Sequence, residues 1–130
     1  MKTLLFLVSV MTVLCGCIQK ELAISIPVIN ENEMKKEIVI NTGDLIKFAL
    51  ESNPTTGYHW HVKYDSEILR LTENQFIEGG KTGLAGSSGT QKFVFRAVKT
   101  GETIIQFSYI REWEKNTPPA KKIVCQVKIN

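Results

Sequence analysis

Residues 91–110 read QKFVFRAVKTGETIIQFSYI and carry the clearest structural signal in the chain. Two runs, Gln91 to Val98 and Thr103 to Ile110, alternate Phe, Ile, Val or Tyr with polar residues, and Thr100-Gly101 lies between them. An apolar side chain at every second position is typical of a β-strand with one buried face. Because a separator that contains glycine favours a turn, the stretch predicts two successive strands.

The same pattern continues on both sides of this stretch. The runs at 36–40 and 45–50 are separated by Asn41-Thr42-Gly43-Asp44 and predict a hairpin. No apolar repeat of helical period continues for three turns. The remaining predicted strands are 58–64, 122–129 and a possible first strand at 23–29. About seven short strands in this length predict an all-β, immunoglobulin-like antiparallel sandwich.

Length and composition limit the possible functions. The chain has 130 residues, so it can form one domain but cannot form a two-domain enzyme or a large barrel. Its net charge is +3, and the charges do not cluster on any stretch. A basic patch of the kind that binds nucleic acid is therefore not indicated, and no cofactor is expected.

The N-terminal segment has the features of an export signal. Lys2 precedes an apolar run that ends at Leu14, and this run is too short to span a hydrocarbon core about 30 Å thick. Leu14-Cys15-Gly16-Cys17 resembles a bacterial lipobox, in which the last cysteine is acylated after cleavage. The resemblance predicts a cleaved signal at 1–16 and a lipid on Cys17. An ordinary secretory signal with incidental cysteines remains the alternative.

Removal of residues 1–16 changes the counts that matter for cysteine chemistry. It takes away Lys2 and Cys15, which leaves 114 residues with a net charge of +2. If Cys17 carries lipid, Cys125 is then the one remaining thiol. Cys125 lies in a strand-like run without a base beside it, so we expect a small buried apolar residue and not a nucleophile.

Catalytic motifs are weak in this sequence. Gly79-Gly80-Lys81-Thr82 lacks the earlier glycine of a phosphate-binding loop, because Gln75 occupies that position. His59 and His61 share a strand face but have no third ligand cluster, which favours two surface histidines over a metal site. A strained nucleophile elbow is also missing from the pattern. We therefore expect neither an enzyme nor a metal site.

Three segments together resemble the chagasin-type inhibitors of papain-like cysteine peptidases, the ICP family. Asn53-Pro54-Thr55-Thr56-Gly57 followed by an aromatic residue matches the first inhibitory loop of that family. Gly86-Ser87-Ser88-Gly89-Thr90 matches the second, with Ser88 where glycine is usual. Arg111-Glu112-Trp113 matches the third, with Glu112 in place of proline. The resemblance covers roughly residues 36–130, and the first motif is its specific part.

The resemblance implies a reversible, tight-binding inhibitor whose three loops lie at one end of a sandwich and enter the peptidase cleft. Thr55 and Thr56 would lie over the target's catalytic pair, and the other residues of that loop would hold its shape. Trp113 would pack on the far rim of the cleft, and Arg111 would orient it or meet acidic groups. The predicted peptidase-binding residues are Asn53, Pro54, Thr55, Thr56, Gly57, Gly86, Ser87, Ser88, Gly89, Arg111 and Trp113.

The same reasoning predicts the organisation and the setting of the protein. A lipid-anchored tether with a possible first strand occupies 17–35, and the inhibitor domain occupies 36–130. The protein is expected to be a monomer before it meets its target, on the exported side of the membrane, either at its periplasmic face or at the cell surface. Two alternatives remain open: an immunoglobulin-like binding or adhesion lipoprotein with a partner other than a peptidase, and an envelope-assembly subunit.

Overall fold

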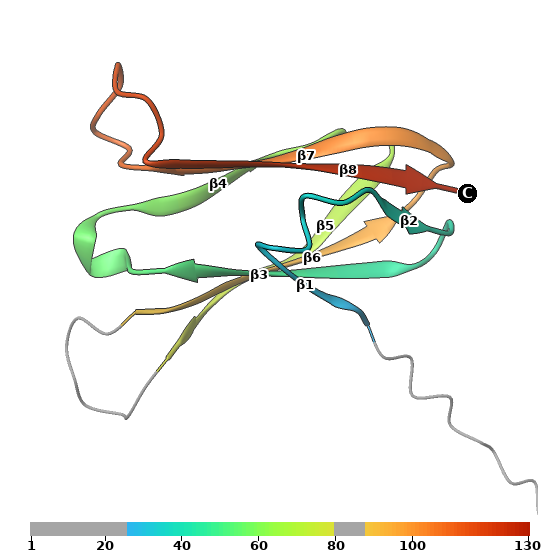
Figure 1. Cartoon of the computed structure of the whole chain (residues 1–130), viewed down its shortest axis with the longest axis horizontal. Helices are drawn as coiled ribbons and strands as arrows, with labels where there is room; N and C mark the ends of the chain where they lie inside the picture. Colours follow the sequence, from blue (N-terminus) through green and yellow to red (C-terminus); the bar gives the residue numbers. More distant parts are fainter. Residues whose placement is uncertain (1–25, 80–87) are drawn as a thin grey trace, which may run out of the picture.

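The computed structural model describes residues 26–79 and 88–130, which form two β-sheets packed face to face (Figure 1). Strands supply nearly all of the regular structure, together with one short 3₁₀ turn, η1. The elements are β1 (Val28–Asn30), β2 (Ile38–Ile40), β3 (Leu45–Ser52), η1 (Pro54–Thr56), β4 (His59–Lys63), β5 (Leu69–Glu78), β6 (Gly89–Ala97), β7 (Gly101–Ile110) and β8 (Lys121–Ile129).

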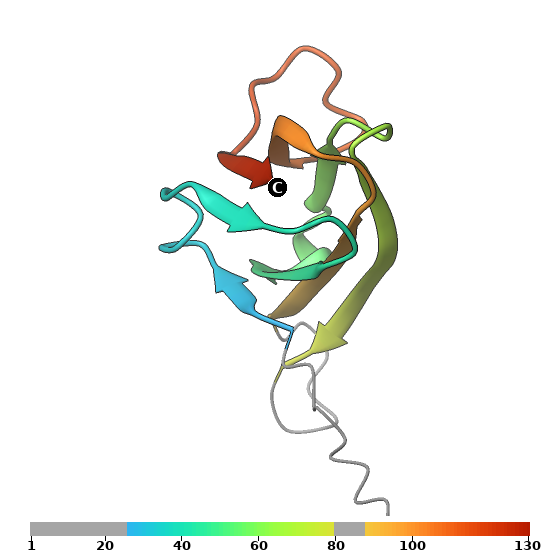
Figure 2. The same cartoon turned by 90° about the vertical axis from the view of Figure 1, so that its right-hand side faces the viewer.

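Each sheet contains four strands. The order is β1-β3-β6-β5 in the first, here called sheet A, and β2-β8-β7-β4 in the second, sheet B. Figure 2, which looks along the strands, shows the two layers. The predicted all-β sandwich is thereby confirmed, with eight strands in the described part of the chain where the sequence predicts about seven. The predicted runs 91–98 and 103–110 correspond to β6 and β7.

The predicted hairpin of residues 36–40 and 45–50 is wrong. β2 pairs with β8 in sheet B, whereas β3 pairs with β1 and β6 in sheet A. The connection between β2 and β3 therefore crosses from one sheet to the other. Its amide groups bond to both sheets: Thr42 N–H donates to Asn130 O (3.0 Å) and Gly43 N–H to Ala97 O (2.8 Å).

The structure adds a strand and two parallel pairings to the predicted fold. β5 was not predicted, and a register shift between Leu71 and Glu73 in its pairing with β6 interrupts the regular alternation. The two short strands β1 and β2 run parallel to β3 and β8, while the other pairings are antiparallel. Parallel pairing is possible here because each partner is distant in sequence or joined by a crossing connection.

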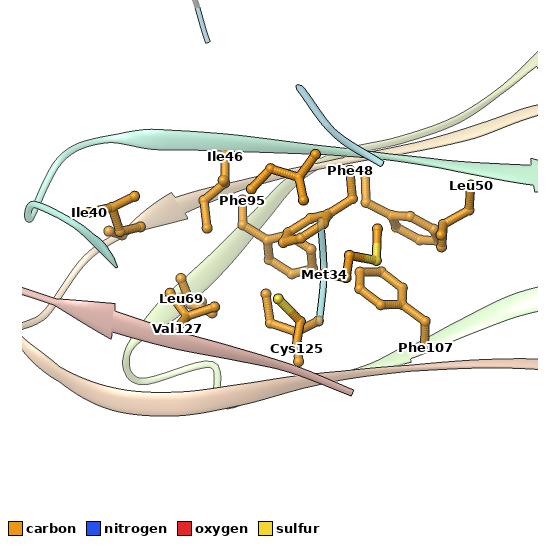
Figure 3. Packing of buried hydrophobic residues seen from close by; sticks show 14 of the residues in the cluster. Met34, Ile40, Ile46, Phe48, Leu50, Leu69, Phe95, Phe107, Cys125 and Val127 are labelled. Atoms are coloured by element: carbon orange, nitrogen blue, oxygen red, sulfur yellow. The ribbon is translucent and has the colours of Figure 1, made fainter. Parts of the chain in front are cut away.

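The core lies between the sheets and is rich in aromatic residues (Figure 3). Phe48 of β3 meets Phe107 of β7 across the interface, with 5.2 Å between ring centroids. Each such fully buried side chain stabilises the fold by about 1.5–3 kcal/mol. Ile29 of β1 and Met34, which follows it, are also buried in this core. The core thus fixes both sheets, and with them the ends of the strands that carry the loops.

The structure confirms the prediction for Cys125. Its side chain is completely buried, and burial raises the pKa of its thiol to about 11. A thiol with that pKa is neutral at pH 7 and is a poor nucleophile. Within residues 26–79 and 88–130, no helix has the length and apolar character needed to cross a membrane.

Candidate functional site

Two connections lie together at one end of the sandwich, the same end at which β5 finishes and β6 begins (Figure 1). The first loop, residues 53–58, carries the chain from β3 in sheet A to β4 in sheet B. The second loop joins β5 to β6 in sheet A, and the third loop, residues 111–120, joins β7 to β8 in sheet B. The first loop therefore begins beside the described ends of the second loop, Gly79 and Ser88, and finishes beside the third loop. Their predicted residues meet at this end, except Gly86 and Ser87, which lie outside the described residues.

Strand register places the loops beside one another. Ser52, the last residue of β3, pairs with Gly89, and Gly89 also pairs with Glu78 at the end of β5. On the other side, His59 at the start of β4 pairs with Ile110 at the end of β7. The strand ends that carry the second and third loops thus lie directly beside the strand ends that carry the first.

The first loop is folded by its own residues. Asn53 is extended (φ −131°, ψ 89°), as the residue before a proline usually is, and Pro54 starts the 3₁₀ turn. Thr55 Oγ1 donates to Asn53 Oδ1 at 2.5 Å, and Thr56 Oγ1 donates to Asn53 O at 2.6 Å. Both threonines remain exposed. The loop therefore presents two side chains whose hydroxyl groups are already held in place.

Gly57 ends the turn in a conformation that favours glycine. Its φ is +80°, and its N–H donates to Pro54 O at 2.9 Å. A Cβ at this position would overlap Cη2 of Trp113 and would lie 2.9 Å from Cζ2. The indole ring of Trp113 consequently rests on the backbone of the first loop, although 66% of the residue is exposed. A large exposed aromatic surface at a loop end is suited to binding another protein.

Arg111 links the third loop to the first. Its Nε donates to Thr56 O at 3.1 Å, and its guanidinium carbon lies 4.3 Å from the centroid of the Tyr58 ring. Nη1 forms an ion pair with Glu114 of its own loop at 3.2 Å. The guanidinium carbon is also 5.9 Å from the ring of Trp113. Arg111 thus holds the first loop through a directional hydrogen bond and planar stacking, which a lysine could not reproduce.

Glu112 occupies the position where the family motif has proline, and it contacts a neighbouring strand. Its Oε1 lies 3.4 Å from Nε2 of His61 on β4, and both side chains are largely exposed. An exposed pair of this kind contributes little to stability. His59 is exposed as well, on the same face of β4. In the described part of the chain, no three His, Cys, Asp or Glu side chains gather as a metal site would require.

The second loop is described only where it leaves the strands. Ser88 is exposed, and its carbonyl accepts the N–H of Gly79 at 3.2 Å. Gly89 is buried, and a Cβ there would overlap the carbonyl oxygen of Ile77 and lie 2.5 Å from the ring of Phe76. The close approach of these two strands explains why position 89 has no side chain.

Three residues of the site were not among the predicted ones. Tyr58, the last residue of the first loop, stacks on Tyr109 with 5.1 Å between ring centroids, and Glu114 pairs with Arg111. The sequence offered one signal for Tyr109: it shares the inward alternation of Ile105 and Phe107. Its contact with residues more than fifty positions away could not be inferred from that alternation.

Comparison with known proteins agrees with this geometry. Residues 39–127 match the chagasin family peptidase inhibitor I42. Amoebiasin-2 of Entamoeba histolytica is 30% identical over 106 residues, which cover 81% of this chain and 86% of that protein. Chagasin of Trypanosoma cruzi is 24% identical over 98 residues, 72% of this chain and 88% of chagasin.

Solved structures give the same result. The crystal structure of a cysteine protease inhibitor from Entamoeba histolytica superposes with a TM-score of 0.74 and 29% identity, over 81% of this chain and 96% of that chain. The family match covers more than half of the chain and describes inhibitors, so the prediction of an inhibitor and not an enzyme is confirmed. The chain belongs to the chagasin family of peptidase inhibitors.

Proposed function

We propose that this protein inhibits papain-like cysteine peptidases by placing its three loops in the active-site cleft. The observation that carries the proposal is the first loop, which exposes Thr55 and Thr56 with both hydroxyls held by Asn53. The likeness to a cysteine protease inhibitor of Entamoeba histolytica supports the choice of target class.

The geometry of the loop end suits a reversible inhibitor. The first loop is closed by its own hydrogen bonds and is tied to the third by Arg111 and by the packing of Trp113 on Gly57. A surface that is already ordered loses little conformational entropy when it binds. In this proposal the two threonines cover the catalytic pair of the peptidase. Trp113 packs on one rim of the cleft, and the second loop follows the opposite wall.

A titration tests this mode of inhibition. Residues 18–130, added to papain or a cathepsin-like enzyme with a fluorogenic peptide, should abolish cleavage at a ratio of 1:1. Thr55→Ala combined with Thr56→Ala should weaken inhibition at least tenfold, because two hydrogen bonds worth about 1 kcal/mol each are lost. Thr100→Ala, in an exposed bend at the other end of the molecule, is the matched control. Lack of inhibition at micromolar concentration, or equal loss in the control, would refute the proposal.

We further propose that the protein is a lipoprotein of the cell envelope, anchored through Cys17 on the exported side of the membrane. The support is the sequence of residues 1–20, in which the apolar run ends at Leu14-Cys15-Gly16-Cys17. Two or more acyl chains would hold the protein stably, whereas one chain would not.

Labelling with a fatty-acid probe in the producing cell tests the anchor. The wild-type protein and Cys15→Ser should both take up the label and fractionate with membranes, and Cys17→Ser should do neither. Uptake by Cys17→Ser, or none by the wild type, would exclude this anchor and favour an ordinary cleaved signal.

A further inference from the structure

A stack of four side chains connects the first and third loops to strands β4 and β7. Trp60 of β4 packs against Tyr109 of β7 with 4.8 Å between ring centroids. Tyr109 stacks in turn on Tyr58, with centroids 5.1 Å apart and an angle of 24° between the planes. The guanidinium group of Arg111 also packs on the ring of Tyr58, with its carbon 4.3 Å from the ring centroid. The stack therefore extends from the buried Trp60 to the exposed third loop.

The lower end of this stack is fixed to both sheets. Trp60 is 6% exposed, and its Nε1 donates to the carbonyl of Glu51 on β3 at 2.8 Å. That bond joins sheet B to sheet A two residues before the first loop begins. The rings of Tyr109 and Tyr58 consequently pack on a tryptophan whose position is fixed by both sheets.

Tyr109 also reaches the first loop itself. The backbone N–H of Asn53 donates to the hydroxyl oxygen of Tyr109 at 2.9 Å, in a half-buried position. Asn53 is the first residue after β3, where the chain leaves sheet A. Two residues further along the chain, directly after β7, the Nε of Arg111 donates to the carbonyl of Thr56 at the other end of the turn. The end of β7 thus holds both the start and the finish of the loop that exposes the threonines.

We propose that Tyr109 is a positioning residue for inhibition, and that its hydroxyl sets the place of the first loop relative to the third. The proposal rests on the proposed function of these loops. The ring of Tyr109 lies between Trp60 and Tyr58, so its contribution passes through the loop and not through contact with the peptidase. The bond joins residues 56 positions apart, and for this reason no local sequence motif encodes it.

Tyr109→Phe isolates the hydroxyl group, because both ring contacts can persist. Inhibition should weaken about tenfold, which is the size expected for one hydrogen bond. If the first loop of the variant adopts its binding conformation only part of the time, the apparent affinity for the peptidase is reduced in proportion to that fraction of time. The loss should therefore appear in the association rate, with the dissociation rate unchanged. Tyr64→Phe is the matched control: Tyr64 is half-buried against Phe95 and follows β4 at the opposite end.

Amide hydrogen exchange in the free proteins tests the positioning without a peptidase. The Asn53 amide should be protected in the wild type and in Tyr64→Phe, and should exchange at least tenfold faster in Tyr109→Phe. An unprotected Asn53 amide in the wild type, or unchanged exchange in Tyr109→Phe, would overturn the proposal. So would unaltered inhibition, or a loss confined to faster dissociation, which would indicate direct contact. If the wild type inhibits no peptidase, the proposed function fails, and the exchange data still decide whether Tyr109 holds the loop.

Discussion

Replacement of Gly57 by alanine should have two unfavourable effects, one on the stability of the fold and one on the packing of Trp113. The first is backbone strain, because an L-residue at φ +80° costs about 1–2 kcal/mol. The second is steric: the new Cβ would overlap Cη2 of Trp113, so the indole ring must leave the first loop. Gly43→Ala supplies the matched control, since its φ is +94° and nothing lies within 4 Å of the added Cβ.

The two variants should lose similar stability and very different activity. The strain alone lowers the melting temperature by about 4–16 °C in a domain of this size. Displacement of Trp113, as an exposed aromatic anchor, should cost about 2 kcal/mol or more of binding energy, or roughly thirtyfold in inhibition constant. Gly43→Ala should therefore inhibit as the wild type does, whereas Gly57→Ala should inhibit at least thirtyfold more weakly.

Thermal unfolding and a peptidase titration measure these two quantities. Tryptophan fluorescence reports the indole directly once Trp60 is replaced by Phe, and the emission of Trp113 should shift in Gly57→Ala alone. Equal inhibition constants for Gly57→Ala and Gly43→Ala would refute the reasoning, because they would show that the packing of Trp113 on Gly57 plays no part in binding. An unshifted Trp113 emission would do the same.

Two further predictions concern Arg111 and Cys125. Arg111→Lys keeps the charge but loses the bond to Thr56 and the stacking on Tyr58, so inhibition should weaken about tenfold; equal inhibition by the variant would mean that charge alone matters. Burial raises the pKa of the Cys125 thiol from 9.0 to about 11, so the folded protein keeps this proton at a higher pH than the unfolded chain does. The resulting contribution to the free energy of unfolding is complete below pH 9 and should be lost between about pH 9 and 11. Chemical denaturation across that range should show this slope in the wild type and not in Cys125→Ala, and rapid reaction of the native thiol with Ellman's reagent at pH 8 would contradict the assigned burial.

Sequence patterns predicted the strands in which a buried apolar side chain recurs at every second position. β6, β7 and β8 are of this kind: Phe93 and Phe95, Ile105 and Phe107, and Cys125 and Val127 are buried between the sheets. β5 escaped prediction because its bulge near Leu71 breaks the period of two. The turn before β3 resembles a hairpin turn in sequence, because Gly43 suits a turn within one sheet as well as a crossing between two. Local sequence cannot distinguish these cases; the pairing of β2 with a distant strand decides between them.

The candidate site divides in the same way. The motif at 53–57 could be recognised because its internal bonds join residues two or three positions apart. The seat of Trp113 on Gly57 and the bond from Asn53 to Tyr109 join segments more than fifty residues apart, and only the folded sandwich brings them together. Motif matching could therefore identify the loops but could not show the contacts that hold them in place.

The parallel pairing of β1 with β3 also determines where a carrier can be attached without covering the loops. β1 runs in the direction of β3, so Ile26 and Pro27 lie beside Gly43 and Asp44, at the end opposite the loops. The carbonyl of Asn130 accepts the N–H of Thr42 at that same end. A bead, a dye, a lipid or a fusion partner joined next to residue 26 or residue 130 would therefore leave the whole loop end accessible, and the inhibitor would point away from whatever carries it.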